Sequence, residues 1–329
     1  MKYIYSFLSF LFLLTTIHSQ TIFSDDFESY AVGSYIGTQS SYWTTWSGTT
    51  GGAEDAMVTN TYASSGSNSI AFSSTSSNGG PQDVVLDFGQ LFTSGIFTLE
   101  SDFYIMNGKN GYFNLQGSQT IGSIWALDIF MDNGQVVFDD GAQQAIGTYT
   151  SETWFTLKID ANLTLGVWKA YIDNNLVGTW NNSTNTIASL DLYPIQNSDY
   201  YVDDISFGHQ TYTMPNLNGM VAGLDMGGTI AGQTVTPTVT IVNAGQTTIT
   251  DAAIILDYDG ITTPLSLTGL SIASTSSYDM TFSSMSLVAG STPVQAYITS
   301  INGGADNDAS DDTLSQTINP IVPATGKMV

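Results

Sequence analysis

Alternation of apolar and polar residues with a period of two is the feature that most constrains the fold of this chain. Residues 154–160 read Trp-Phe-Thr-Leu-Lys-Ile-Asp, which places Phe155, Leu157 and Ile159 on one face. Residues 234–242 repeat the pattern, with valine and isoleucine alternating against threonine. Because successive side chains of a strand point to opposite faces, this pattern indicates sheets with one buried face. Long helical periodicity is absent, so we predict an all-β protein.

Short segments rich in Asn, Asp and Gly separate the predicted strands. They are Asp132-Asn133-Gly134, Asp139-Asp140-Gly141, Asp173-Asn174-Asn175 and Tyr258-Asp259-Gly260. These residue types tolerate the positive φ that tight hairpins need. Hydrophobic residues make up 42% of the chain, which is too many for a disordered protein. The chain is therefore expected to form many short strands joined by tight turns.

Residues 1–19 are typical of a secretory signal peptide. The charge of Lys2 precedes an apolar run from Ile4 to Leu14, and Ser19 is a small residue at the expected cleavage point. This run is shorter than the ~20 apolar residues that a bilayer-spanning helix needs. No later segment of the sequence is long and apolar enough to span. We therefore expect a secreted or outer-surface protein that does not insert into a membrane once the signal is removed.

The chain contains no cysteine and no arginine, and its formal net charge is −24. An exported chain without cysteine has no disulfide framework and no cysteine to carry a lipid, so its core alone must hold it together. Nucleic acid is excluded as a partner, because binding a phosphate backbone needs Lys and Arg to displace counterions. Cations are the partners that such a polyanion attracts.

The length predicts two domains. We place the first at residues 20–210 and the second at residues 219–318. Between them, residues 211–218 lose the strand periodicity and include a proline, which is typical of a linker. Residues 319–329 form a second linker-like segment at the C-terminal end.

Several motifs of the first domain resemble those of concanavalin A-like jelly rolls, the group that includes laminin-G-like and MAM domains. The residues that carry the resemblance are Asp26-Phe27-Glu28, Ser65-Gly66-Ser67-Asn68-Ser69-Ile70, the pair of segments 154–159 and 168–173, and Val202-Asp203-Asp204-Ile205. They cover nearly the whole domain. The resemblance implies an antiparallel jelly-roll sandwich of the binding type, with a hairpin formed by the paired segments.

The second domain carries the segment Val239-Thr240-Ile241-Val242-Asn243-Ala244-Gly245, followed by strand patterns near residues 254–258, 278–282 and 294–299. It resembles the immunoglobulin-like modules of bacterial adhesion proteins, which implies an immunoglobulin-like β-sandwich that acts as a spacer. Residues 323–329 resemble the segment that leads into a thioredoxin-like domain in related outer-membrane proteins. That resemblance implies a fragment or a truncated gene product.

Side chains for catalysis are scarce. After the signal peptide the sequence has one histidine, His209, and it has no Gly-x-Ser-x-Gly turn to support a serine triad. Jelly-roll glycoside hydrolases carry a Glu-x-Asp-x-(x)-Glu pattern on one strand, and Glu100-Ser101-Asp102 supplies only its first two members. We therefore predict that the protein is not an enzyme, with a glycoside hydrolase as the less favoured alternative.

Tryptophans are the candidate ligand-binding residues. Trp43 and Trp46 could stack sugar rings from a loop, or they could fill the core instead. Trp125, Trp154 and Trp168 lie on strand patterns, so we expect them in the core. The predicted function is non-catalytic binding of a surface glycan or glycoprotein through the jelly roll. The alternative is a structural or adhesive surface protein without a small ligand.

A structural calcium ion is the predicted cofactor. Asp26 and Glu28 flank Phe27 and so share one face of the opening strand. Asp203 lies on the closing strand, and the first and last strands of jelly rolls are often neighbours. Carboxylates brought together in this way repel unless a cation lies between them, and calcium prefers oxygen ligands. We predict that Asp26, Glu28 and Asp203 bind this ion, as the resemblance also implies. The alternative is that these acids are solvated strand ends.

Overall fold

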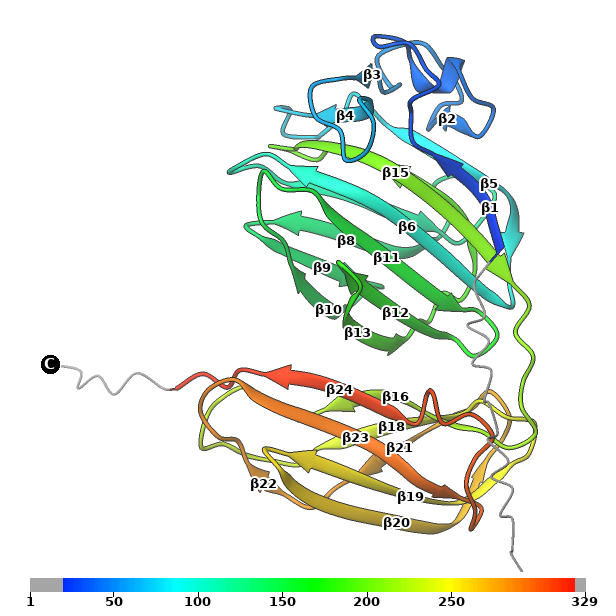
Figure 1. Cartoon of the computed structure of the whole chain (residues 1–329), viewed down its shortest axis with the longest axis vertical. Coiled ribbons are helices and arrows are strands. Elements are labelled where there is room, and N and C mark those ends of the chain that lie inside the picture. Colours follow the sequence, from blue (N-terminus) through cyan, green and yellow to red (C-terminus); the bar gives the residue numbers. More distant parts are fainter. Residues whose placement is uncertain (1–19, 323–329) are drawn as a thin grey trace, which may run out of the picture.

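The chain folds into two β-sandwiches, one above the other (Figure 1). The computed structural model describes residues 20–322, so the predicted signal peptide and residues 323–329 of the predicted C-terminal linker lie outside the described residues. The described part contains one short 3-10 helix, η1 (Ile36–Thr38), and otherwise strands, turns and loops. The prediction of an all-β protein is confirmed. Within residues 20–322, no helix has the length and apolar character that crossing a bilayer requires.

The larger sheet of the first domain has eight strands. They are β1 (Gln20–Asp25), β3 (Val58–Thr59), β4 (Ser69–Ser73), β6 (Ile96–Ile105), β11 (Phe155–Asn162), β12 (Val167–Ile172), β13 (Asn175–Asn181) and β15 (Asp199–Gln210). Their spatial order is β13-β12-β11-β6-β15-β4-β3, and β1 pairs antiparallel with the second half of β15. The opening and closing strands are thus neighbours, as predicted, with Asp25 opposite Ile205.

A seven-stranded sheet packs against this one and completes the jelly-roll sandwich. It contains β2 (Trp43–Thr45), β5 (Val84–Phe92), β7 (Gly111–Gln116), β8 (Trp125–Asp132), β9 (Gln135–Asp139), β10 (Gln143–Thr148) and β14 (Ile187–Leu192). The spatial order is β10-β9-β8-β7-β14-β5-β2. All strand pairs in both sheets are antiparallel. The predicted fold class is confirmed.

Aromatic and aliphatic side chains fill the space between the two sheets. Phe103 of one sheet stacks on Phe113 of the other, with 5.0 Å between ring centroids. The predicted inward residues Phe155, Leu157 and Ile159 are all buried. The hairpin turns also follow the prediction, because residues such as Asn133, Asp173 and Asn174 adopt positive φ. Turn chemistry and strand burial therefore agree at these predicted segments.

The second domain is a smaller antiparallel sandwich. Its strands are β16 (Gly219–Asp225), β17 (Thr234–Val235), β18 (Thr238–Asn243), β19 (Ile249–Tyr258), β20 (Ile261–Ile272), β21 (Ser277–Thr281), β22 (Met285–Ser286), β23 (Thr292–Ile301) and β24 (Thr313–Ile318). A sheet of order β16-β18-β21 packs on one of order β20-β19-β23-β24, and β17 pairs with β22. Val239 and Ile241 point into this core, as the alternation predicts. Kinship with immunoglobulin-like modules stays a prediction.

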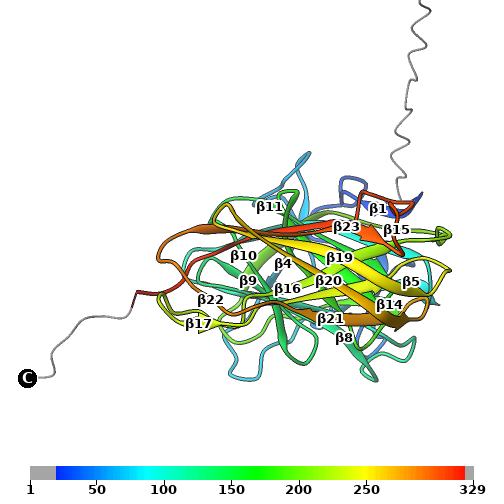
Figure 2. The same ribbon diagram turned by 90° about the horizontal axis from the view of Figure 1, so that it is seen from below.

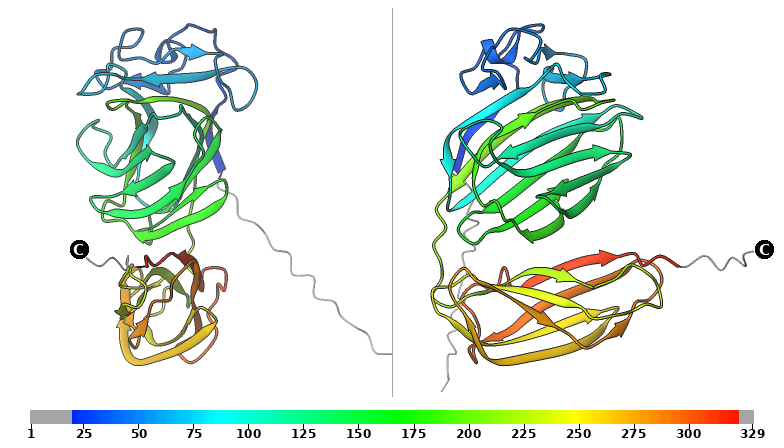
Figure 3. Two further views of the ribbon diagram at one scale, coloured as in Figure 1. Left: turned by 90° about the vertical axis from the view of Figure 1, so that its left-hand side faces the viewer. Right: turned by 180° about the vertical axis from the view of Figure 1, so that it is seen from behind.

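One connection joins the two sandwiches at one side of the molecule (Figure 3). β15 ends at Gln210 and β16 begins at Gly219. Seen from below, the strands of the second sandwich lie over those of the first (Figure 2). A small apolar cluster, which includes Leu165 of the first domain and Met220 of the second, packs across the junction. The two domains therefore meet through packed side chains as well as through the linker.

Candidate functional site

The two tryptophans proposed for ligand binding lie in different environments. Trp43 is only 2% exposed, and its indole N–H donates to Asp25 Oδ2 at 3.0 Å. Trp43 therefore belongs to the core, because a ring enclosed on both faces cannot stack on a sugar. Trp46, three residues later, is 37% exposed and keeps its candidate role. The side-chain alternation of β2 does not reach Trp46, which lies just beyond the end of that strand.

Trp46 meets Trp125 on the outer side of the seven-stranded sheet. Their ring centroids are 6.3 Å apart, and the two planes are tilted by 37°. Trp125 is 44% exposed, so the expectation that it lies in the core was wrong. It is the first residue of β8 and pairs with Gln116, which puts its ring at the outer rim of the sheet. We call Trp46 and Trp125 together the tryptophan pair.

An apolar row continues along the same outer face. Tyr112, Phe130, Val137 and Ile146 lie opposite one another in successive registers across β7, β8, β9 and β10. Tyr112 and Phe130 have ring centroids 5.0 Å apart. Phe130 and Ile146 are exposed. The outer face therefore carries a band of aromatic and aliphatic surface, separated from the tryptophan pair by one row of residues.

A polar row lies next to this band. Asp191, Asn114, Asp128 and Asp139 lie opposite one another across β14, β7, β8 and β9. Tyr112 Oη donates to Asp128 at 2.5 Å, and Asn114 Nδ2 donates to Asp191 at 2.8 Å. Carboxylates and amides that alternate with core residues point away from the core. This face thus offers hydrogen-bonding groups directly beside aromatic rings.

Part of the polar face is covered by loops. Asn114 and Gln116 lie on the outer face, because their neighbours Phe113 and Leu115 point into the core. Both are nevertheless buried. The backbone N–H of Gly122, in the loop between β7 and β8, donates to Gln116 Oε1 at 2.7 Å. Gln116 in turn donates to Asn114 at 2.9 Å. The covering loop is therefore tied to the sheet by a chain of buried amides.

Two carboxyl groups come together beneath this cover. Asp83 precedes β5 and Asp191 lies in the adjacent strand β14, and the two carboxyl groups lie within hydrogen-bonding reach of each other. Burial, together with repulsion from Asp191, raises the pKa of Asp83 to about 8, and burial raises the pKa of Asp191 to about 6. The buried oxygens Asp83 Oδ1 and Asp191 Oδ1 find no donor within residues 20–322. A single proton shared between the carboxyl groups satisfies both.

The three residues predicted to bind calcium surround one loop of the first domain. Asp203 is fully buried and accepts the N–H of Ser64 at 2.7 Å. Glu28 Oε1 accepts the N–H groups of Ser67 and Asn68 at 2.7 and 2.6 Å. These carboxylates thus anchor the loop that precedes β4. The calcium ion itself stays a prediction.

Asp26 completes that set and lies nearby. Its carboxylate accepts the N–H of Glu28 at 3.2 Å. Burial raises the pKa of Asp204, and the negative charges of Asp102, Asp26 and Glu28 raise it further. Burial likewise raises the pKa of Asp203, to about 6. These acids lie around one loop, but within residues 20–322 the carboxylate oxygens of Asp26, Glu28 and Asp203 do not all lie within 4.8 Å of one another. Backbone N–H groups meet part of their negative charge.

The residues considered for catalysis lie elsewhere. Glu100 lines a cleft of about 590 Å³ between the two domains, together with Lys158 and Lys169. Asp102 accepts hydrogen bonds from Ser64 Oγ and Thr156 Oγ1 instead. His209 lies in β15, where its Nε2 is 2.8 Å from the carbonyl oxygen of Ser94. These groups do not form a shared site.

No protein-family model and no curated relative matches the chain. Solved structures with partial similarity include a protein of unknown function with a galectin-like fold from Bacillus subtilis, at 10% identity and a TM-score of 0.41. The match covers 60% of this chain and 99% of that one. The carbohydrate-binding module CBM66 from Bacillus subtilis has 16% identity and a TM-score of 0.35, covering 51% of this chain and 95% of that one.

A third structure is that of an enzyme. The alginate lyase AlgAT5 of polysaccharide lyase family 7 has 18% identity and a TM-score of 0.33, and the match covers 43% of this chain and 78% of that chain. The similar structures thus include both a binding module and a lyase. What each of them binds or cleaves is a property of that protein.

Proposed function

We propose that the first domain is a non-catalytic glycan-binding module of a protein that acts outside the cell, at the cell surface or in the medium. The observation that carries the proposal is the exposed tryptophan pair, Trp46 and Trp125. Exposed neighbouring indoles are unusual in a domain that buries most of its other large aromatic side chains. The flat face of an indole suits the apolar face of a pyranose ring.

The surroundings of the pair supply the polar half of sugar recognition. Ligand sites combine apolar contact area with a few fixed hydrogen-bonding groups. Here Asp128 and Asp139 lie on neighbouring strands beside the rings, and both are partly exposed. Carboxylates accept hydrogen bonds from sugar hydroxyls. We therefore propose that a glycan lies along the outer face of β7, β8 and β9, with one ring on the tryptophan pair.

A neutral or cationic glycan fits this face better than an acidic one. The chain has a formal net charge of −24, and the face contributes Asp128 and Asp139 to it. The like charges of this face would repel an acidic sugar and weaken its binding. A surface glycan or glycoprotein rich in neutral hexoses is the partner that we propose. If this glycan is attached to another cell, binding it would make the protein adhesive.

Catalysis by the Asp83–Asp191 pair is the alternative that the structure raises, but the geometry does not favour it. Glycosidases hold their two carboxyl groups ~5–5.5 Å apart when they retain configuration, and further apart when they invert it. Asp83 and Asp191 are in direct hydrogen-bonding contact, so no sugar fits between them. Asp191 is also only 3% exposed. We assign the pair a role in stability.

The deciding experiment is a glycan-array screen, followed by titration of the best neutral glycan against variants. We expect Trp46→Ala and Trp125→Ala each to weaken binding at least ~10-fold, because each removes an aromatic contact worth about 1.4 kcal/mol or more. Tyr278→Ala is the matched control, since Tyr278 is 41% exposed but lies in the second domain. Unchanged affinity in both tryptophan variants would refute the proposal.

A reducing-end assay on a polysaccharide panel separates binding from turnover. We expect no release of product by the wild-type protein. Product release that disappears in Asp83→Asn would instead assign the first domain to the glycan-cleaving enzymes. Product release that persists in Asp83→Asn but disappears in Glu100→Gln would move the active site to the inter-domain cleft.

A further inference from the structure

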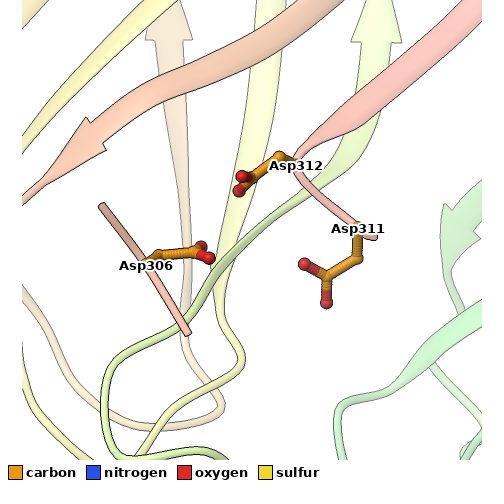
Figure 4. A group of neighbouring side chains, drawn as sticks. All are labelled: Asp306, Asp311 and Asp312. Carbon is orange, nitrogen blue, oxygen red and sulfur yellow. The ribbon is translucent and has the colours of Figure 1, made fainter. Parts of the chain in front are cut away.

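Three aspartates of the second domain converge beside the junction with the first domain (Figure 4). Asp306 lies in the connection between β23 and β24, and Asp311 and Asp312 directly precede β24. One carboxylate oxygen from each lies within 4.8 Å of the other two. Within residues 20–322, this is the one such group of three acidic, histidine or cysteine side chains. All three aspartates are partly buried, which distinguishes them from acids on an open surface.

The negative charge of this group is poorly compensated. Burial raises the pKa of Asp311 to about 7, with added repulsion from Asp308 and Asp306. Burial and the neighbouring Asp306 raise the pKa of Asp312 to about 7 as well. Asp311 Oδ1 and Asp312 Oδ1 are buried and have no hydrogen-bond donor in the described part of the chain. The group therefore presents acceptor atoms that no protein donor satisfies.

A buried amide provides a second, independent observation. Asn218 is fully buried, and its Nδ2 donates to Asp311 Oδ2 at 3.1 Å. Its Oδ1 is buried without a hydrogen-bond partner among the described residues. Buried polar atoms without a partner are rare and call for a missing ligand or water. A half-turn of the amide exchanges its nitrogen and oxygen, so Asn218 can present an oxygen to the aspartates when a cation lies among them.

We propose that Asp306, Asp311 and Asp312, together with Asn218, bind a divalent cation of the calcium class. Calcium takes ~6–8 oxygen ligands from carboxylates, amide carbonyls and waters, in flexible geometry. The three carboxylates and the amide are ligands of this type. No thiolate or imidazole belongs to the group, so its donor set suits hard cations and not zinc or copper.

The position of the site gives the cation a role at the junction. Asp306 Oδ2 accepts the N–H of Gly219 at 2.9 Å. Leu217 and Asn307 exchange two hydrogen bonds, each 2.9 Å long. Asp311 also lines the cleft between the domains, where Lys169 of the first domain lies. A bound cation holds residues 217–219 against the β23–β24 connection, directly where the linker enters the second domain, and thereby stiffens the junction.

Calorimetric titration of the full chain with Ca²⁺ tests the site. We expect Asp312→Asn to weaken the binding at this site at least ~10-fold, because one of three charged ligands is lost. In EDTA, Asp312→Asn should unfold at the same temperature as the wild type or higher, since one like charge is removed. Lost binding is then separable from lost folding. Asp259→Asn is the matched control, because Asp259 is an exposed acid of the same domain.

Proteolysis of the junction tests whether the bound cation stiffens it. We expect Ca²⁺ to slow cleavage by thermolysin within residues 211–218 in the wild type and in Asp259→Asn, but not in Asp312→Asn. Equal Ca²⁺ affinity in Asp312→Asn and the wild type would overturn the proposal. So would binding that is lost in Glu28→Gln and kept in Asp312→Asn, because the ion would then lie in the first domain. A wild-type chain that takes up no divalent cation would overturn it as well.

Discussion

Trp46 lies directly on Gly122, so that a β-carbon added to Gly122 would fall 2.5 Å from Cζ2 of the indole. Gly122 also has a φ of +75°, in the left-handed region that favours glycine. The loop between β7 and β8 therefore supports the exposed ring from below. The position of the tryptophan pair depends on the absence of a side chain at Gly122.

Gly122→Ala should displace Trp46 and weaken glycan binding while the domain stays folded. The added methyl group cannot remain 2.5 Å from the indole, so the ring or the loop must shift. The left-handed φ adds ~1–2 kcal/mol of backbone strain. We expect a loss of glycan affinity of at least ~10-fold, measured by titration, and a change in the tryptophan fluorescence spectrum.

Gly89→Ala is the matched control for that variant. Gly89 has a φ of +77°, and a β-carbon there would meet no atom within 4 Å. It therefore carries the same backbone strain without the clash. Equal losses of glycan affinity in the two variants would show that strain, and not the position of Trp46, controls binding.

Trp43→Phe should destabilise the first domain without altering glycan affinity. Asp25 accepts hydrogen bonds from the Trp43 indole, the Tyr30 hydroxyl and the Phe27 N–H. Phenylalanine removes one donor from this buried carboxylate, and hydrogen bonds to charged groups contribute ~1.5–3 kcal/mol. We expect a drop of about 2 kcal/mol in the free energy of unfolding, measured by urea denaturation. A glycan affinity that falls with Trp43→Phe as far as with Trp46→Ala would contradict the core role.

Much of the fold could be predicted because strand alternation and turn chemistry are local properties. Phe155, Leu157 and Ile159 follow the period of two and are buried. Trp125 was misjudged because a β-bulge between Trp125 and Leu127 breaks the alternation, so that Trp125 pairs with the outward Gln116 and is exposed. The bulge shows only in the pairing of β8 with β7, and the local period of β8 does not record it.

The acidic groups that the sequence analysis missed were missed for the same reason, because their members meet only in the folded chain. Asp83 directly precedes β5 and Asp191 lies in the neighbouring strand β14, but more than a hundred positions separate them in the sequence. Only the order of strands in the sheet brings them together. The aspartates at 306, 311 and 312 lie in the acidic segment Asp-Asn-Asp-Ala-Ser-Asp-Asp, but their spacing differs from that of a calcium loop, whose first ligands stand at alternate positions. The contribution of Asn218, from the opposite end of the domain, could not be read from that segment.

Asp83→Asn should reduce the fall in the free energy of unfolding that the wild type shows as the pH rises. Both members of the Asp83–Asp191 pair have a folded-state pKa above the ordinary aspartate value of 3.8. The folded protein therefore holds more protons than the unfolded chain between about pH 4 and about pH 8, and the free energy of unfolding falls as the pH rises through that window. Asparagine cannot ionise, so Asp191 no longer faces a second negative charge.

Urea denaturation from pH 5 to pH 9 measures this effect. We expect the wild type to lose stability across the range and Asp83→Asn to lose less, with the difference between them growing up to about pH 8. Other acids with raised pKa values are common to both proteins and cancel in the comparison. Parallel curves would mean that Asp83 is ionised in the folded protein and that no proton is shared.

The calcium ion predicted at Asp26, Glu28 and Asp203 can be separated from the one proposed in the second domain by working in an Asp312→Asn background. Glu28→Gln keeps an oxygen that can accept the N–H groups of Ser67 and Asn68, so the loop should stay anchored while the charge is lost. If the ion binds, EDTA lowers the unfolding midpoint of the Asp312→Asn protein. A ligand at ~100 times its Kd stabilises by about 2.7 kcal/mol, which shifts the midpoint by several degrees. The added Glu28→Gln substitution should abolish that shift. If EDTA does not change the unfolding midpoint of the Asp312→Asn protein, no ion binds at Asp26, Glu28 and Asp203. These acids then serve only to anchor the loop before β4 through backbone N–H groups.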